Sequence, residues 1–300
     1  MIHAAAVRTV LAAALALSLP AAGQHHSSMD VDVEDGARAG CSGIHMRFGD
    51  LATTRGEETV TLSRTEAKGL VLEGARHGGV TVRGADTGTF TVTACKAAGG
   101  DDEAAAGAVL AKIALRSSGG RVTIEGPAGE RWSAFLVVTA PRDADFSVEG
   151  SNGPVSLSNL SGTLDVRTAN GPVSLTGLTG AVTVDAANGP VSLKSSSGDV
   201  KIHAVNGPLT IALAGARWEG KGLEADAKNG PLTLRLPDDF ASGVRVETSS
   251  HAPLSCRAAA CGSAHRQDEG RTRLLEFGGD ASIRLSSVNG PVSIVGSNRS

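Results

Sequence analysis

Few residues in this sequence have the types and spacing that catalysis requires. The adjacent carboxylates Asp238 and Asp239 could be a pair for glycoside cleavage. In a strand, however, neighbouring side chains point to opposite faces, so the two groups would not meet on one substrate. There is no G-x-S-x-G sequence to present a nucleophilic serine, and no histidine is placed to activate one. The sequence therefore predicts no enzyme, no catalytic residues and no cofactor.

A metal site is also not predicted. The segment MDVDVEDG, from Met29 to Gly36, superficially resembles a calcium loop. Its glycine comes one place late, and position twelve counted from Asp30 is Cys41 rather than glutamate. We interpret this segment as part of a solvated tail.

The first 23 residues have the layout of a secretory signal peptide. His3 and Arg8 precede an apolar run from Val10 to Leu19, and small residues follow it up to Gly23. This run is too short to span about 30 Å of hydrocarbon as a helix. We therefore expect cleavage after Gly23, no stable membrane span, and an exported protein that is periplasmic, surface-bound or secreted.

Export favours disulfides over metal binding for the four cysteines. They lack CxxC spacing, although His251 and His265 flank the second pair. Cys256 and Cys261 can close a small loop, and Cys41 then pairs with Cys95 by elimination. The competing interpretation is that Cys256 is a buried free thiol.

Charge and composition exclude further classes of protein. The chain carries 28 basic and 31 acidic residues, with no basic cluster, so we predict no nucleic-acid partner. Aromatic residues make up 3% of the sequence, so Val, Leu, Ile and Ala must build the core.

An internal repeat determines the architecture. The sequence N-G-P-V-S begins at positions 152, 170, 188 and 289, and N-G-P-L-T begins at 206 and 229. Between 152 and 206 the period is 18 residues, and each period holds two halves that alternate apolar and polar residues. Such alternation predicts two short strands per repeat. Coils of this kind stack into an all-β, single-stranded parallel β-solenoid.

Stacking the repeats puts apolar residues in every inward column. One column contains Val155, Val173, Val191, Leu209 and Leu232, and another contains Val148, Val166, Val184, Ile202 and Ala225. At the corner, glycine permits positive φ and proline fixes the start of the strand. The corner asparagines should then form a ladder of side-chain amides, made of Asn152, Asn170, Asn188, Asn206, Asn229 and Asn289.

Two surface features could make contacts. The outward column Ser156, Ser174, Ser192, Thr210 and Thr233 is a stripe of hydroxyls, which we interpret as a solvated face; such stripes can also bind glycans. A five-residue insertion, 216–220, carries Arg217 and Trp218. Trp218 is either a contact residue or a lid on the solenoid.

The chain divides into four predicted parts: signal peptide (1–23), flexible tail (24–40), N-terminal β region (41–142) and repeat solenoid (143–300). Residues 97–108 are predicted as a loop. For 105–115 a short helix is the alternative, and we favour a loop followed by a strand. The last coil has no cap in the sequence, so we expect its edge to pair with something else.

The corner motif after a signal peptide, with strands such as S-G-D-V-K-I, resembles a bacterial adhesin-like β-strand-repeat domain family of unknown function. The resemblance covers about 146–246 and 282–295, and more weakly 69–139. It implies an exported, non-catalytic binding or scaffolding protein of the cell envelope, with a glycan or an envelope component as partner. The alternatives are a carbohydrate-active β-helix enzyme and a ligand-free structural or stress-linked envelope protein.

Overall fold

The structure is a computed structural model that describes residues 29–33, 40–129 and 131–297. The predicted signal peptide and residues 298–300 lie outside the described residues. Of the helices in the described ranges, none is long and apolar enough to cross a membrane.

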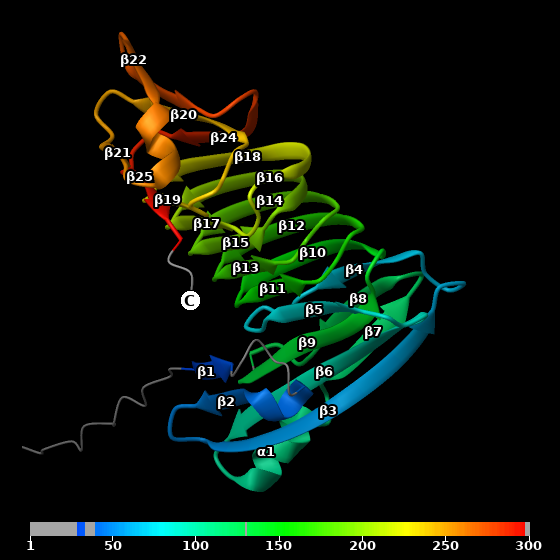
Figure 1. Cartoon of the computed structure of the whole chain (residues 1–300). Coiled ribbons are helices and arrows are strands. Elements are labelled where there is room, and N and C mark those ends of the chain that lie inside the picture. The colour runs from blue at the N-terminus through cyan, green and yellow to red at the C-terminus, as the bar shows by residue number, and fades with distance from the viewer. Residues whose placement is uncertain (1–28, 34–39, 130, 298–300) are drawn as a thin grey trace, which may run out of the picture.

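Two long sheets lie face to face and form the body of the molecule (Figure 1). We name them sheet 1 and sheet 2. In spatial order, sheet 1 contains β22 (His265–Glu269), β23 (Thr272–Phe277), β20 (Gly243–Ser249), β24 (Ala281–Ser287), β18 (Glu219–Asn229), β16 (Ser197–Asn206), β14 (Ala181–Asn188), β12 (Thr163–Asn170), β10 (Asp145–Asn152), β4 (Gly69–Glu73), β8 (Arg121–Glu125) and β7 (Ala114–Ser118). Sheet 2 contains β21 (Leu254–Cys256), β25 (Val292–Gly296), β19 (Leu232–Leu236), β17 (Leu209–Leu213), β15 (Val191–Ser195), β13 (Val173–Thr176), β11 (Val155–Ser158), β5 (Val80–Ala85), β9 (Trp132–Pro141), β6 (Thr89–Gly100) and β3 (Ala52–Ser63).

The central strands of both sheets pair in parallel with the predicted register, which confirms the β-solenoid. Val166 pairs with Val184, and Val184 pairs with Ile202. In the facing sheet, Val173 pairs with Val191. All these side chains are at most 2% exposed and belong to one core that extends from the N-terminal strands to β25. Branched aliphatic residues fill the space between the sheets in the regular coils, and aromatic residues such as Phe90 and Phe146 join the same core at its N-terminal end.

The repeated corner glycine has a packing reason that adds to the predicted positive φ. A Cβ on Gly189 would lie 2.3 Å from the carbonyl oxygen of Gly171, which occupies the same corner one coil away. A Cβ on Gly171 would likewise lie 2.3 Å from the carbonyl oxygen of Gly153. Successive corners therefore approach so closely that only glycine fits between them.

The coils at the C-terminal end do not stack in chain order. The last coil, β24 and β25, lies between the Asn229 coil and the coil formed by β20 and β21. Both of its edges are therefore paired, and the prediction of an open final coil is wrong. Beyond it, β20 pairs with the antiparallel hairpin of β22 and β23, which caps this end of the solenoid (Figure 1).

The N-terminal end has the same kind of arrangement. β4 and β5 stack directly on β10 and β11, although about 60 residues separate β5 from β10 along the chain. The later strands β8 and β9 lie outside them. Antiparallel pairing of β9 with β6, and of β6 with β3, closes this end. Non-sequential stacking therefore caps both ends of the parallel stack.

Two predictions for the N-terminal part are wrong. The segment predicted as loop contains helix α1 (Glu103–Leu110), and β6 continues to Gly100 before it. Asp102 caps the helix by accepting a hydrogen bond from the backbone N–H of Ala105 at 2.7 Å, and the alanine-rich segment favours helix. Within the predicted flexible tail, β1 (Met29–Val33) pairs antiparallel with β2 (Ile44–Phe48). β2 packs on the outer surface of sheet 2 beside Cys95 and Phe135.

Candidate binding face

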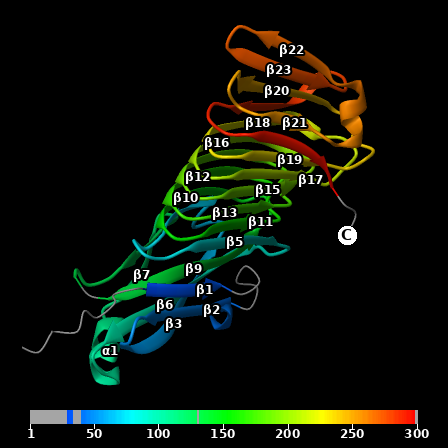
Figure 2. The same ribbon diagram turned by 90° about the vertical axis from the view of Figure 1, so that its left-hand side faces the viewer.

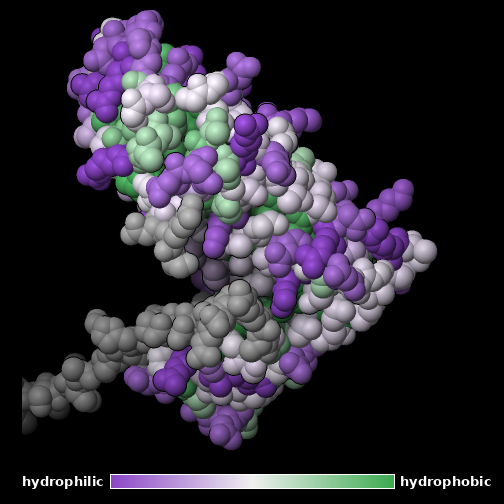
Figure 3. All heavy atoms as spheres, in the orientation of Figure 1, coloured by the Kyte–Doolittle hydropathy of each residue, from purple (hydrophilic) through white to green (hydrophobic). Residues whose placement is uncertain are grey.

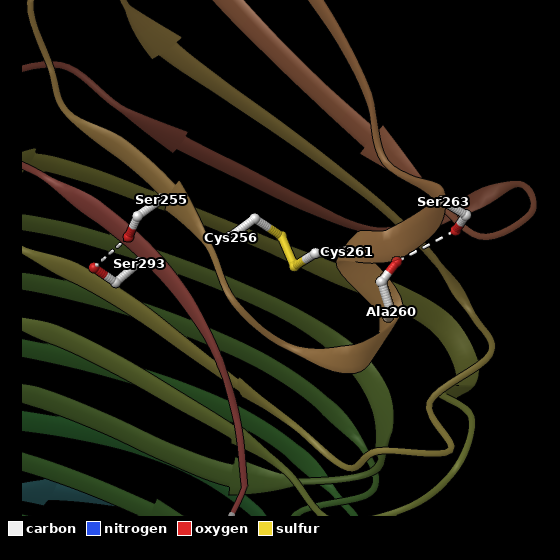
Figure 4. The surroundings of a disulfide bond; sticks show 6 residues. All are labelled: Ser255, Cys256, Ala260, Cys261, Ser263 and Ser293. Atoms are coloured by element: carbon white, nitrogen blue, oxygen red, sulfur yellow. Dashed lines mark hydrogen bonds between the residues drawn. A yellow bond between two sulfur atoms is a disulfide. The ribbon is translucent and has the colours of Figure 1, made fainter.

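The outer surface of sheet 2 carries a hydroxyl column longer than the repeats alone predict. Strand pairing aligns one hydroxyl per strand from β5 to β21. The column consists of Thr81, Ser156, Ser174, Ser192, Thr210, Thr233, Ser293 and Ser255. At its far end, the Ser255 hydroxyl lies 3.2 Å from that of Ser293 (Figure 4). Figure 2 shows the strands that carry it, with β5, β11, β13, β15, β17 and β19 lying one above another.

A second outward column runs beside the hydroxyls and contains three cations. In strand order it consists of Arg83, Ser158, Thr176, Lys194, Ala212 and Arg235. Arg83, Lys194 and Arg235 are exposed, and none of them forms an ion pair with another described residue. From β5 to β19 neither column contains a carboxylate. We name these two columns together the hydroxyl–basic face.

The outer surface of sheet 1 differs from the hydroxyl–basic face in its charged side chains. Its outward columns mix acids and bases, as in the run Glu149, Arg167, Asp185, His203 and Asp226. Arg167 donates to Asp165 in the neighbouring column at 2.7 Å, so its charge is locally balanced. The two faces of the solenoid therefore differ in charge, although the same repeats build both.

A groove of about 740 Å³ opens at the N-terminal end of the hydroxyl–basic face. Most of its described lining consists of hydroxyl side chains, including Thr91, Ser156 and Ser174, and Arg83 is the one charged residue among the described lining residues. Gly40, at the start of the 3-10 turn Gly40–Gly43, also lines it. In the space-filling view the molecule is hollowed between the upper coils and the N-terminal strands (Figure 3). The groove therefore offers many hydrogen-bonding groups and one cation to a ligand.

The groove was not predicted from the sequence as a site. Ser156 and Ser174 belong to the repeats, and the repeat alone predicts that they lie in one stripe of hydroxyls. Arg83 and Thr81 were missed because β5 reaches β11 by pairing across about 70 residues of chain. No local signal in the sequence places β5 there.

Of the two roles predicted for Trp218, contact residue or lid, its position in the structure fits the lid. It is 7% exposed, and its indole Nε1–H donates to the carbonyl of Gly198 at 3.2 Å. Its ring belongs to the main core, so Trp218 is not available as a surface anchor. Arg217 beside it is exposed.

The six corner asparagines form one continuous ladder. Each amide Nδ2 donates to the Oδ1 of the preceding corner, with distances of 2.9 to 3.1 Å, and the ladder ends with Asn289 bound to Asn229. At the other end Asn152 donates to the carbonyl of Arg76. These residues hold the coils in register and are not placed to bind a ligand at the groove.

Both disulfides are present. Cys41 bonds to Cys95, which ties the segment before β2 to β6, and Cys256 bonds to Cys261. Figure 4 shows the second bond joining β21 to the short 3-10 helix η3 (Ala259–Ser263). It pins the connection that leads into the β22–β23 cap.

The acidic and histidine residues considered in the sequence do not come together in the described part of the chain. Asp238 and Asp239 are exposed in a turn and not in a strand, so the prediction that strand geometry points them to opposite faces is wrong. Among the described residues, no group of three His, Cys, Asp or Glu side chains is placed to hold a metal ion. His251 and His265 are both exposed.

The chain was compared with protein families and with known proteins. A family model described as Toastrack DUF4097 matches residues 28–294. No curated protein matches the chain.

Three similar solved structures illustrate how far the likeness extends. One is a proposed cell adhesion protein from Clostridium sporogenes, 12% identical, covering 81% of this chain and 100% of that one, with a TM-score of 0.34. Another is a proposed adhesin from Bacteroides fragilis, 11% identical, covering 82% and 97%, with a TM-score of 0.29. A third is a proposed lipid binding protein from Parabacteroides distasonis, 11% identical, covering 82% and 97%, with a TM-score of 0.30. Scores this low carry no argument about function.

Proposed function

The chain belongs to the Toastrack DUF4097 family, and from that premise we propose that it is an exported, non-catalytic, adhesin-like binding protein of the bacterial envelope. In this proposal residues 1–23 are a cleaved signal peptide, and the β region 41–142 and the repeats 143–300 form the mature binding module. The ligand is an envelope or surface glycan.

The hydroxyl–basic face carries the proposal. Ser and Thr hydroxyls both donate and accept hydrogen bonds, which suits the hydroxyl groups of a sugar. The column presents one hydroxyl about every 4.8 Å, the spacing of neighbouring strands, so it can follow an extended polymer. The groove at one end, which contains Ser156, Ser174 and Arg83, adds a concave starting point for such a ligand.

The non-catalytic part of the proposal rests on the chemistry of this face. Hydrolysis of a glycosidic bond uses two carboxylates flanking the bond. The groove lining contains no Asp, Glu or His among the described residues. The described part of the groove can therefore hold a sugar polymer but lacks the carboxylate pair that hydrolysis uses.

A binding screen with matched variants tests the proposal. The mature protein is screened against envelope polysaccharides, together with the double variant Ser174→Gln/Thr176→Gln, which fills the groove with larger neutral side chains. The control is Thr183→Gln. Thr183 is exposed on the outer surface of sheet 1, in β14, the strand that follows β13 along the chain. We expect at least one polysaccharide to bind the wild type and the control and to lose affinity for the double variant. Absence of binding to any polysaccharide would favour a ligand-free structural role.

A further inference from the structure

We propose that the ligand of the hydroxyl–basic face is a carboxylated polysaccharide, held with its chain along the solenoid axis and across the strands. This inference rests on the proposed function and specifies its substrate class. The observation behind it is the second outward column, in which Arg83, Lys194 and Arg235 lie on one line with no carboxylate between them.

The three cations lie a whole number of strand steps apart along the axis. Three strand steps separate Arg83 from Lys194, and two separate Lys194 from Arg235. At about 4.8 Å per strand these steps amount to roughly 14 Å and roughly 10 Å. A polymer that carries a carboxylate on each sugar can meet all three cations while its hydroxyls face the Ser/Thr column.

The cations are available to a ligand because no described acid neutralises them. Other described bases form ion pairs, such as Arg64 with Asp143, Arg142 with Asp86 and Lys221 with Asp199, and offer less free charge to a ligand. Arginine can bind a carboxylate with two parallel hydrogen bonds, and two of the three cations are arginines. A neutral polymer would leave these charges unused, whereas an anionic one pairs with them.

Membranes and nucleic acids fit this face less well. Among the described residues the one large apolar side chain that is strongly exposed, Val288, follows β24 and lies off the hydroxyl–basic face. The face therefore has no apolar group to insert into a lipid surface. Three isolated cations are also few for a duplex, whose binding depends on many phosphate contacts.

The test compares polygalacturonate with its methyl ester, which has the same backbone without the charge. Binding to the mature protein is measured by isothermal titration calorimetry at low and at physiological salt. The variant Arg83→Gln/Lys194→Gln/Arg235→Gln removes the three cations. The control Lys201→Gln/Arg245→Gln/Arg284→Gln removes three exposed bases from the outer surface of sheet 1.

We expect the wild type to bind polygalacturonate at least tenfold more tightly than the ester, with an affinity that falls as salt rises. The hydroxyl–basic variant should lose this preference, and the sheet 1 variant should keep it. Equal binding of both polymers by all three proteins would overturn this inference and leave the proposed function standing. Absence of binding to any polysaccharide would overturn both. Tighter binding to anionic phospholipid vesicles or to double-stranded DNA than to polygalacturonate would also overturn the inference. Circular dichroism establishes that both variants are folded.

Discussion

Asn188 donates a hydrogen bond from its Nδ2 to the Oδ1 of Asn170 at 3.1 Å, and Asn170 occupies the same corner one coil away. The same Nδ2 also donates to the backbone carbonyl of Ala169 at 3.1 Å. In return, the Oδ1 of Asn188 accepts from Asn206 at 3.0 Å. An amide is the group that can donate and accept in this way at every rung, which explains why the corner repeats asparagine.

Asn188→Asp should therefore weaken the ladder. A carboxylate keeps the acceptor for Asn206 but cannot donate to Asn170, so two oxygens would face each other. Because the corner is exposed, we expect a loss of about 1 kcal/mol in the free energy of unfolding, measured by urea denaturation. Thr183→Asp adds the same charge to the same coil away from the ladder. If both variants lose equal stability, the ladder is not a stabilising element.

Trp218→Ala should destabilise the protein strongly. Removal of a buried Trp side chain costs roughly 3–5 kcal/mol. Trp218→Phe keeps part of the ring packing and loses the hydrogen bond to Gly198, so its loss should be smaller. Arg217→Ala, at the exposed neighbouring position, should change the melting temperature little. A Trp218→Ala protein that melts like the wild type would contradict the description of Trp218 as a lid.

Truncation tests the non-sequential stacking of the C-terminal coil. A chain that ends at Phe277 lacks β24 and β25, which lie between the Asn229 coil and the β20–β21 coil. It should lose cooperative thermal unfolding in this part of the molecule, because two paired edges open in each sheet. A chain that ends at Ser297 retains every described strand and should melt like the full chain. If the coils stacked in chain order, the first truncation would only shorten the solenoid.

The pKa of Glu58 gives a prediction about pH. The backbone N–H of Leu115 donates to its carboxylate at 3.1 Å, and Lys96 Nζ lies 3.0 Å away; both lower its pKa. The stability that these contacts provide is present above the usual glutamate pKa of about 4.3 and is lost as the pH falls through the lowered folded-state value.

Glu58→Gln should therefore reduce the free energy of unfolding at pH 7 more than at pH 3. Urea denaturation of both proteins at the two pH values measures the difference. An equal effect of the substitution at pH 7 and pH 3 would contradict the assignment of this contact.

The features that could be predicted from the sequence are those that a single repeat specifies. The alternation within β12 and β14 gives the buried positions of Val166 and Val184, and the 18-residue period gives their register. The hydroxyl stripe through Ser156 and Ser174 follows in the same way.

The features that were missed depend on pairing between distant segments. β5 and β25 have ordinary strand sequences, and their place in the stack depends on the connections available to the whole chain. Without the position of β5, Arg83 could not be aligned with Lys194. Helix α1 was missed because its alanines resemble a small-residue loop, although Asp102 supplies the cap.

The most direct test of the central claim uses two exposed lysines on successive strands of the chain, Lys194 of β15 on the hydroxyl–basic face and Lys201 of β16 on the outer surface of sheet 1. Their acetylation by a small reagent is measured by mass spectrometry with and without polygalacturonate. We predict that the polymer slows acetylation of Lys194 several-fold and leaves Lys201 unchanged. Unchanged reactivity of Lys194 at a polymer concentration that saturates binding, or protection of Lys201 instead, would contradict the assignment of the binding face.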